Sequence, residues 1–273
     1  MTQIQIKKEA GPPGVGYFAL SEMQRLNCGY YHDSCHALEV ADLVQRLARA
    51  FGRSQERAEF LKQVALIHDA DPRTCPHTGH ARVGTPARVP VTLDWMEKER
   101  DHLIERFEWR GEQYHEAVAL IARTDFPFDH KPRAYGTRWD GLSPVDVYRE
   151  SLLKLSPSAR RKGMVDALLL RFSDQIAAYV GSFERARKSV LDLVNELNNT
   201  GLSLTFEHTF KQTPNFLGGV GKDLDYDERL KFELGLDDLS LPGRTTLLTL
   251  LGWKKRLRLS RNVLQFKLHQ RAV

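Results

Sequence analysis

Several short segments of the chain contain residues that could bind a metal ion. They hold His32 and His36, the adjacent pair His68 and Asp69, and, much later in the chain, Asp174. Neutral imidazole nitrogens and carboxylate oxygens are common ligands of divalent cations. Adjacent His and Asp residues can both contact one ion, and the carboxylate can also bridge to a second. A single His-Asp dipeptide means little, but this ordered set predicts a metal site.

The local sequence places these residues beside or within apolar helical runs. His32 and His36 are four residues apart, so on a helix they would share one face, one binding metal and the other standing near a substrate. Asp174 lies within the apolar run 168–178. A carboxylate there is costly to bury unless it is paired or coordinated. The alternative for Asp174 is an ion pair with Arg171, three residues earlier, but the other ligands favour coordination.

This pattern resembles the HD superfamily of metal-dependent phosphohydrolases, whose helical core supplies ligands in the order His, His-Asp, Asp. It is more similar still to the catalytic core of class I cyclic-nucleotide phosphodiesterases, over residues 30–180. Segment 31–37, Tyr-His-Asp-Ser-Cys-His-Ala, corresponds to the family's His-Asn-x-x-His-Ala, and segment 121–125 corresponds to its Ala-Thr-Asp. The resemblance implies that His36, His68, Asp69 and Asp174 bind metal. It also implies that His32 is the general acid, with Asp69 serving catalysis as a bridging ligand.

The chain departs from that family in three places. Asp33 replaces the family's Asn and puts a carboxylate beside the proposed acid. Pro72 stands where the histidine of a His-Pro-Gly element would be; His77 could restore it through an insertion, and His80 is a competing candidate. Cys75 with these two histidines could instead bind zinc separately, or the loop could hold incidental histidines. The glutamine segment that holds the purine in that family has no counterpart here.

The remaining candidate residues belong to two groups. Residues that could reach a second metal ion or support the first are Asp33, His77, His80, Thr124 and Asp125. Residues that could meet phosphate oxygens are Arg73 and Lys131, both in expected loops.

The activity that these residues favour is metal-dependent hydrolysis of a phosphoester, above all of cyclic nucleotides or related phosphodiesters. We expect divalent ions as cofactors, two in number, drawn from magnesium, manganese, iron and zinc; the ligands do not select among them. Three alternatives stay open. They are an HD-type nucleotide phosphomonoesterase or triphosphohydrolase, an HD-like di-iron oxygenase with added ligands from His77 and His80, and a nucleotide-binding module without catalysis.

Hydrophobic periodicity predicts a mainly helical fold, an HD-type bundle over residues 30–200 with a small C-terminal α+β or loop-rich appendage. The helices are expected at 36–51, 54–67, 93–107, 113–123, 145–155, 164–180 and 184–198, with a loop at 72–90. Beyond residue 201, segments 202–206 and 256–259 alternate with period two, and 256–268 suits a hairpin. The expected domains are therefore 1–200, which is catalytic, and 201–273.

Composition limits the class of protein further. The 273 residues are 41% apolar and 27% charged, as in globular proteins, and no stretch approaches the ~20 apolar residues of a membrane span. Three cysteines without disulfide spacing and the lack of a hydrophobic signal region lead us to expect a cytoplasmic protein. The sequence does not predict an oligomeric state.

The charge of the chain suits an anionic partner. A net charge of +5 agrees with a small phosphoester substrate, a nucleotide in particular, although it also suits an ordinary basic protein. The basic segment 254–271 could contact nucleic acid or an anionic membrane surface. An amphipathic edge strand with its cations facing water is favoured over both, so nucleic acid is a possible partner but not the favoured one.

Overall fold

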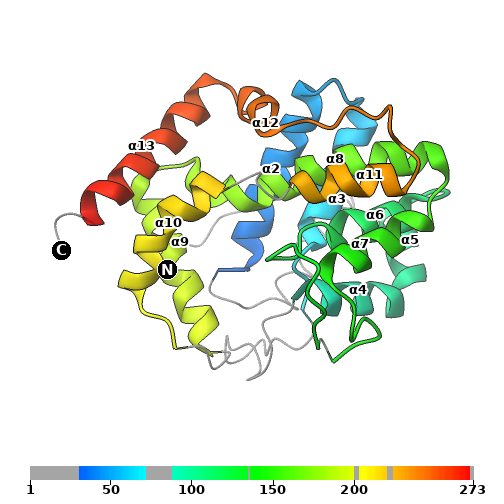
Figure 1. Ribbon diagram of the computed structural model, residues 1–273, viewed down its shortest axis with the longest axis horizontal. Coiled ribbons are helices and arrows are strands. Elements are labelled where there is room, and N and C mark those ends of the chain that lie inside the picture. The colour runs from blue at the N-terminus through cyan, green and yellow to red at the C-terminus, as the bar shows by residue number, and fades with distance from the viewer. Residues whose placement is uncertain (1–30, 72–87, 135, 200–202, 220–223, 271–273) are drawn as a thin grey trace, which may run out of the picture.

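A computed structural model describes residues 31–71, 88–134, 136–199, 203–219 and 224–270 (Figure 1). All regular secondary structure in these ranges is helical, which confirms the expectation of a mainly helical protein. The helices before residue 200 are α2 (Ser34–Ala50), α3 (Gln55–Ile67), α4 (Arg88–Lys98), α5 (Arg100–Phe107), α6 (Gln113–Ala122), α7 (Pro144–Leu153), α8 (Pro157–Ile176), the 3-10 turn η1 (Ala177–Tyr179) and α9 (Phe183–Asn199). Those after it are α10 (Phe206–Gly219), α11 (Leu224–Glu233), α12 (Arg244–Leu250) and α13 (Trp253–Gln270).

Capping residues fix where α2 and α3 begin. The Asp33 side chain accepts a hydrogen bond from the His36 backbone N–H at 2.8 Å, which starts α2. Ser54 caps α3 by accepting from Arg57 N–H. Between the helices, Gly52 adopts a φ of +87°, a conformation that favours glycine. The two helices therefore lie side by side, with His36 in the first turn of α2 and His68 directly after α3.

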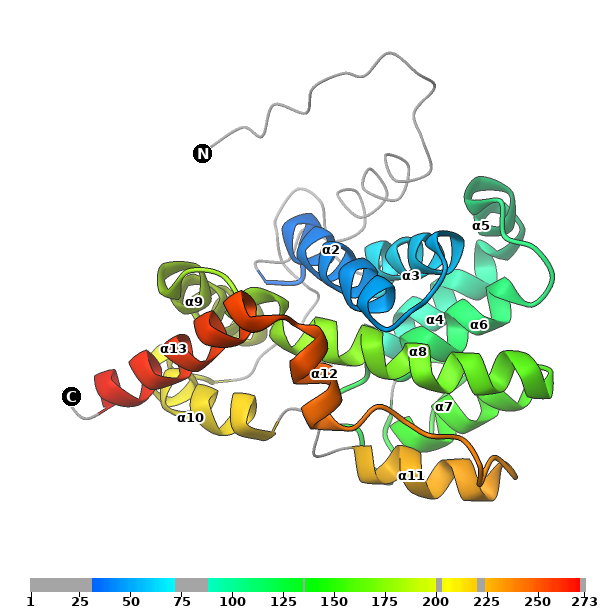
Figure 2. The same ribbon diagram turned by 90° about the horizontal axis from the view of Figure 1, so that it is seen from above.

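Helix α8 is the central element of the molecule. Its apolar side chains are buried along almost the whole length, because α2 and α6 pack against it as well as α7. Figure 2 shows α8 crossing the middle of the molecule, with α2 and α3 on one side and α7 and α11 on the other. Asp174, near the end of α8, therefore lies close to the first turn of α2 and to the end of α3.

Some helix boundaries differ from those expected. The single helix predicted at 93–107 is divided at Glu99 into α4 and α5, and α4 already begins at Arg88, inside the expected loop. Helix α8 begins at Pro157 instead of residue 164, because Ser156 caps it and proline fits the first turn. Gly163 lies within α8, at a position where a Cβ atom would lie 3.4 Å from the Leu155 side chain.

The strands predicted after residue 201 are wrong for the described residues. Helix α13 occupies the segment expected to form a hairpin, and residues 203–205 lead directly into α10. In α13 the buried or half-buried residues Leu259, Val263 and Phe266 recur at helical spacing and contact the core. Asn262 lies within the helix and donates its side-chain N–H to Tyr179 O at 2.7 Å. A tertiary contact therefore stabilises the helix where local alternation suggested strands.

The C-terminal helices pack on the same hydrophobic core as the preceding helices. Phe266 of α13 is fully buried and its ring lies 5.0 Å from that of Phe183. Asp227 of α11 forms a fully buried ion pair with Arg123, the residue after α6, at 2.7 Å. The domain boundary at residue 200 stays a prediction. Among the described helices, none is long and apolar enough to cross a membrane.

Candidate metal centre

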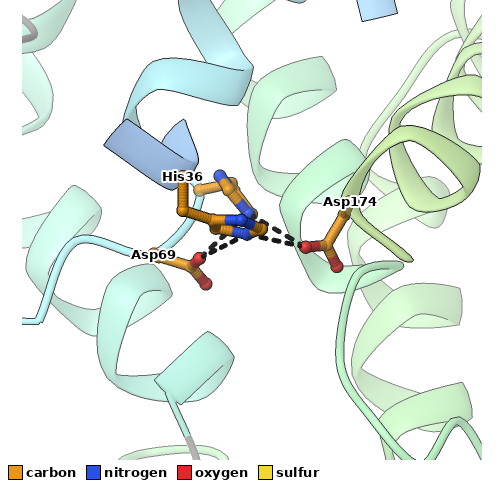
Figure 3. Close-up of side chains that lie close together, drawn as sticks. His36, Asp69 and Asp174 are labelled. Atoms are coloured by element: carbon orange, nitrogen blue, oxygen red, sulfur yellow. Dashed lines mark hydrogen bonds and ion pairs between the residues drawn. The ribbon is translucent and has the colours of Figure 1, made fainter. Parts of the chain in front are cut away.

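The predicted ligands His36, His68, Asp69 and Asp174 meet in the structure, although 138 residues separate the first from the last. One ligand atom from each lies within 4.8 Å of all the others. Figure 3 shows the side chains of His36, Asp69 and Asp174 turned toward one another, each reaching inward from a different part of the chain. Within the described residues this group could hold a metal ion.

The carboxylate oxygens of the group face the Nε2 atoms of both histidines. Asp69 Oδ2 lies 3.0 Å from His68 Nε2 and 3.6 Å from His36 Nε2. Asp174 Oδ1 lies 3.2 Å from His36 Nε2 and 3.4 Å from His68 Nε2. Two imidazole nitrogens and two carboxylate oxygens thus converge on one small region.

A backbone contact fixes how His68 presents its ring. Its Nδ1 lies 2.7 Å from Ala65 O, one turn earlier, and a carbonyl can only accept a hydrogen bond. Nδ1 therefore carries the proton, and Nε2 of a neutral ring presents a lone pair. That lone pair is buried and makes no hydrogen bond in the part of the chain described here. It faces carboxylate oxygens, so a proton or a metal cation between them is needed to avoid repulsion. The donor set therefore fits a cation.

His68 on one side and the two carboxylates on the other shift each other's pKa values toward the charged forms. Burial alone would raise the pKa of the Asp174 carboxyl, but its interactions with His36 and His68 outweigh burial, and the pKa lies well below its usual range. Burial likewise opposes ionisation of Asp69, yet the charges of His68 and His32 lower its pKa. Burial would lower the pKa of His68, but Asp69 and Asp174 raise it well above the ordinary histidine value. Both carboxylates are ionised at neutral pH and attract positive charge.

The two carboxylate oxygens of Asp174 face different partners. Oδ1 faces the histidines, and Oδ2 lies 3.5 Å from Arg171 Nη1. The same Arg171 atom donates to Thr124 O at 2.8 Å. Arg171, expected only as an alternative partner of Asp174, thus fixes the carboxylate while leaving Oδ1 directed into the cluster.

His32 lies beside the cluster and has a buried carboxylate partner. Its Nδ1 is 2.6 Å from Glu196 Oε1, and Glu196 Oε2 accepts from the backbone N–H groups of Tyr31 and His32 at 3.0 Å each. The rings of His32 and His36 are 5.7 Å apart. Glu196 comes from α9, and no local motif points to it, because 164 residues separate it from His32. The Glu196 side chain is almost fully buried, and this burial arises only when α9 packs in the folded chain.

Other candidate residues lie outside this group. Asp33 caps α2, Thr124 Oγ1 donates to Ile121 O at 2.8 Å, and Asp125 Oδ1 accepts from Phe126 N–H at 2.9 Å. Lys131 is exposed, and its backbone N–H donates to Asp129. The expected roles of Arg73, His77 and His80 fall on residues outside the described ranges.

A cavity of about 510 Å³ lies elsewhere, at the amino-terminal ends of α3, α6 and α8. None of the cluster residues lines it. His68 follows the far end of α3, about 18 Å away at the usual rise of about 1.5 Å per residue. Two arginines that line this cavity, Arg53 and Arg57, form ion pairs with Asp166. The metal cluster and this cavity are therefore separate features of the fold.

The chain matches no family model, and no curated protein has a significantly similar sequence. What the site can bind therefore follows from its own residues, from their order in the chain and from their geometry.

Proposed function

We propose that this protein is a metal-dependent phosphohydrolase of the HD type that cleaves phosphodiesters, cyclic nucleotides among them. The observation that supports this function best is the convergence of His36, His68, Asp69 and Asp174, in the order His, His-Asp, Asp, at one buried point. The position of His32 beside them adds a group that can donate a proton.

The four clustered residues would hold the metal. A divalent ion bound there would lower the pKa of a bound water toward neutrality and offset the negative charge of a phosphate group. The chain prepares the site by fixing the His68 ring through Ala65 O and the Asp174 carboxylate through Arg171. Because both carboxylates are ionised at neutral pH, the cluster needs no deprotonation of Asp69 or Asp174 before a cation binds.

His32 would act as the general acid that protonates the leaving oxygen. Glu196 holds its Nδ1, so proton transfer to a substrate would go through Nε2, the other ring nitrogen. The negative charge of Glu196 complements the charged imidazolium that a proton donor requires. His32 is 21% exposed, whereas Glu196 is almost fully buried. The pair therefore combines access to a substrate with a fixed ring orientation.

A panel of phosphoesters tests the substrate class. We expect the purified protein with Mn²⁺ or Mg²⁺ to hydrolyse 3′,5′-cyclic AMP, 3′,5′-cyclic GMP and bis(4-nitrophenyl) phosphate at comparable rates, since no purine-holding segment is found. 4-Nitrophenyl phosphate and nucleoside triphosphates should react more slowly. Activity confined to monoesters or triphosphates would contradict the phosphodiesterase part of the proposal. Absence of any phosphoester hydrolysis by the metal-loaded protein would contradict the whole proposal.

A further inference from the structure

Helix α13 has an unusual charge distribution. Residues 253–270 contain six lysines and arginines and no aspartate or glutamate. The cations are Lys254, Lys255, Arg256, Arg258, Arg261 and Lys267. In an ordinary surface helix, acidic residues would alternate with these and form ion pairs with them. The helix as a whole therefore presents strong positive charge.

One face of α13 holds it on the protein. Phe266 is fully buried, and Leu259 and Val263 are packed against the core. The Asn262 side chain donates to the backbone oxygens of Tyr179 and Gly181 at 2.7 and 3.2 Å. These contacts fix the rotation of the helix about its own axis, so its opposite face is set as well.

That opposite face exposes four large apolar side chains. Trp253, Leu257, Leu264 and Leu268 are 66%, 61%, 55% and 53% exposed. At about 100° per residue, their positions fall within an arc of roughly 60°. They form a stripe along the length of the helix, here called the apolar stripe of α13. Scattered apolar side chains are normal on a protein surface, but four aligned ones indicate a contact surface.

Exposed cations lie on both sides of the apolar stripe. The helical positions of Lys254, Arg258 and Arg261 place them along one side, and those of Arg256 and Lys267 along the other. All five are exposed. Figures 1 and 2 both show α13 at the outer edge of the molecule, where its outer face is not covered by another described helix.

We propose that α13 binds the surface of a membrane that contains anionic lipids, lying in the plane of the interface without crossing it. An apolar stripe flanked by lysine and arginine is the pattern of interfacial helices: the apolar side chains enter the acyl boundary and the cations meet lipid phosphates. Trp253 suits the headgroup level, where tryptophan is enriched. Nucleic acid would satisfy the cations but leave the leucines in water. A second copy of the stripe would bring cations against cations.

Vesicle sedimentation tests this proposal on the full-length protein. We expect it to bind vesicles of phosphatidylcholine mixed with phosphatidylserine, and to bind vesicles of phosphatidylcholine alone far less. The double variant Leu257→Ser/Leu264→Ser should bind the mixed vesicles at least about tenfold more weakly than wild type, because it removes apolar insertion. Arg258→Gln/Arg261→Gln should weaken binding about tenfold or more, and raised salt should do the same in wild type.

The control variant is Leu153→Ser/Leu191→Ser, which changes two exposed leucines on α7 and α9. It should bind mixed vesicles like wild type, and all variants should keep wild-type helicity and melting temperature because the changed residues are exposed. Failure of wild type to bind mixed vesicles at low salt would overturn the proposal. So would binding to an RNA or DNA duplex without vesicle binding, or dimerisation that Leu257→Ser/Leu264→Ser abolishes while vesicles are ignored.

Discussion

At the scale of single residues, the orientation of His68 decides what the cluster can bind. Its Nδ1 proton is committed to Ala65 O, so Nε2 must share a proton or a cation with Asp69 and Asp174. His68→Ala removes this nitrogen ligand and leaves the two carboxylates with one histidine fewer to offset their charge. We expect bound metal per chain to fall at least tenfold, measured by elemental analysis after dialysis, together with loss of hydrolysis.

The control for this experiment is His208→Ala, which removes an exposed histidine on α10. It should keep wild-type metal content and activity. Circular dichroism of both variants separates loss of a ligand from loss of folding, since removing one ligand leaves buried charge less well compensated. Normal metal content in folded His68→Ala would show that His68 is not a ligand.

The pair of His32 and Glu196 predicts a different kind of defect. His32→Ala should lower the hydrolysis rate of substrates with poor leaving groups by about 10²–10⁴, the usual contribution of a general acid. Glu196→Gln keeps the size of the side chain but removes the charge that complements the imidazolium, so we expect a smaller loss of the same kind. Metal content should stay at the wild-type value in both variants.

The leaving group supplies the readout for that prediction. Bis(4-nitrophenyl) phosphate releases a good leaving group that needs little protonation, so its hydrolysis should be affected much less than that of cyclic AMP. Equal losses on both substrates would mean that His32 serves as a ligand or a structural residue and not as an acid.

The sequence predicts part of this site and not the rest, for physical reasons. Residue type and order are sufficient to select His36, His68, Asp69 and Asp174, since metal chemistry limits which side chains can serve. Glu196 could not be selected, because only the fold brings α9 to His32. Asp174 had two interpretations from sequence: Oδ2 lies near Arg171, as the ion pair requires, while coordination of a metal by Oδ1 stays a prediction.

At the scale of elements, the cap of α2 links stability to the site. Asp33→Ala removes the acceptor for the His36 N–H, and loss of such a cap costs about 1 kcal/mol of unfolding free energy. Because His36 lies in the capped turn, we also expect weaker metal binding. Asp33→Asn keeps the cap, since asparagine caps as well as aspartate, and should behave like wild type. Chemical denaturation and metal titration measure the two effects; equal behaviour of both variants would contradict the role of the cap.

Helical periodicity predicted elements where it was strong and failed where it competed with alternation. The bounds expected for α2, α3, α6 and α9 lie within a few residues of those observed, because their apolar residues recur at i, i+3 and i+4. In 256–268 the same leucines fit both a strand and a helix. Two tertiary contacts favour the helix: Asn262 with Tyr179 O, and Phe266 with the core. They join residues that are distant in the sequence, so the local pattern could not predict them.

At the scale of the whole molecule, the pair of Arg123 and Asp227 joins α11 to the core. Both side chains are fully buried, and Arg123 donates to both Asp227 oxygens. Asp227→Ala would leave a buried guanidinium without its main counter-charge, which costs about 3–5 kcal/mol in comparable cases. Thermal and chemical unfolding measure this loss. Asp42→Ala, which breaks an exposed pair with Arg46, is the matched control and should change stability little. Similar stability of both variants would contradict the proposed anchoring of α11.

The proposed function requires that the buried cluster hold a divalent metal that the chain needs to hydrolyse phosphodiesters. The most direct measurement is the rate of bis(4-nitrophenyl) phosphate hydrolysis by chelator-treated protein as Mn²⁺ or Mg²⁺ is added back, for wild type and for Asp174→Asn. We expect wild type to lose activity on chelation and regain it on addition of metal, and Asp174→Asn to stay inactive at metal concentrations that saturate wild type. Undiminished hydrolysis after chelation, or equal recovery by Asp174→Asn, would contradict the proposed function.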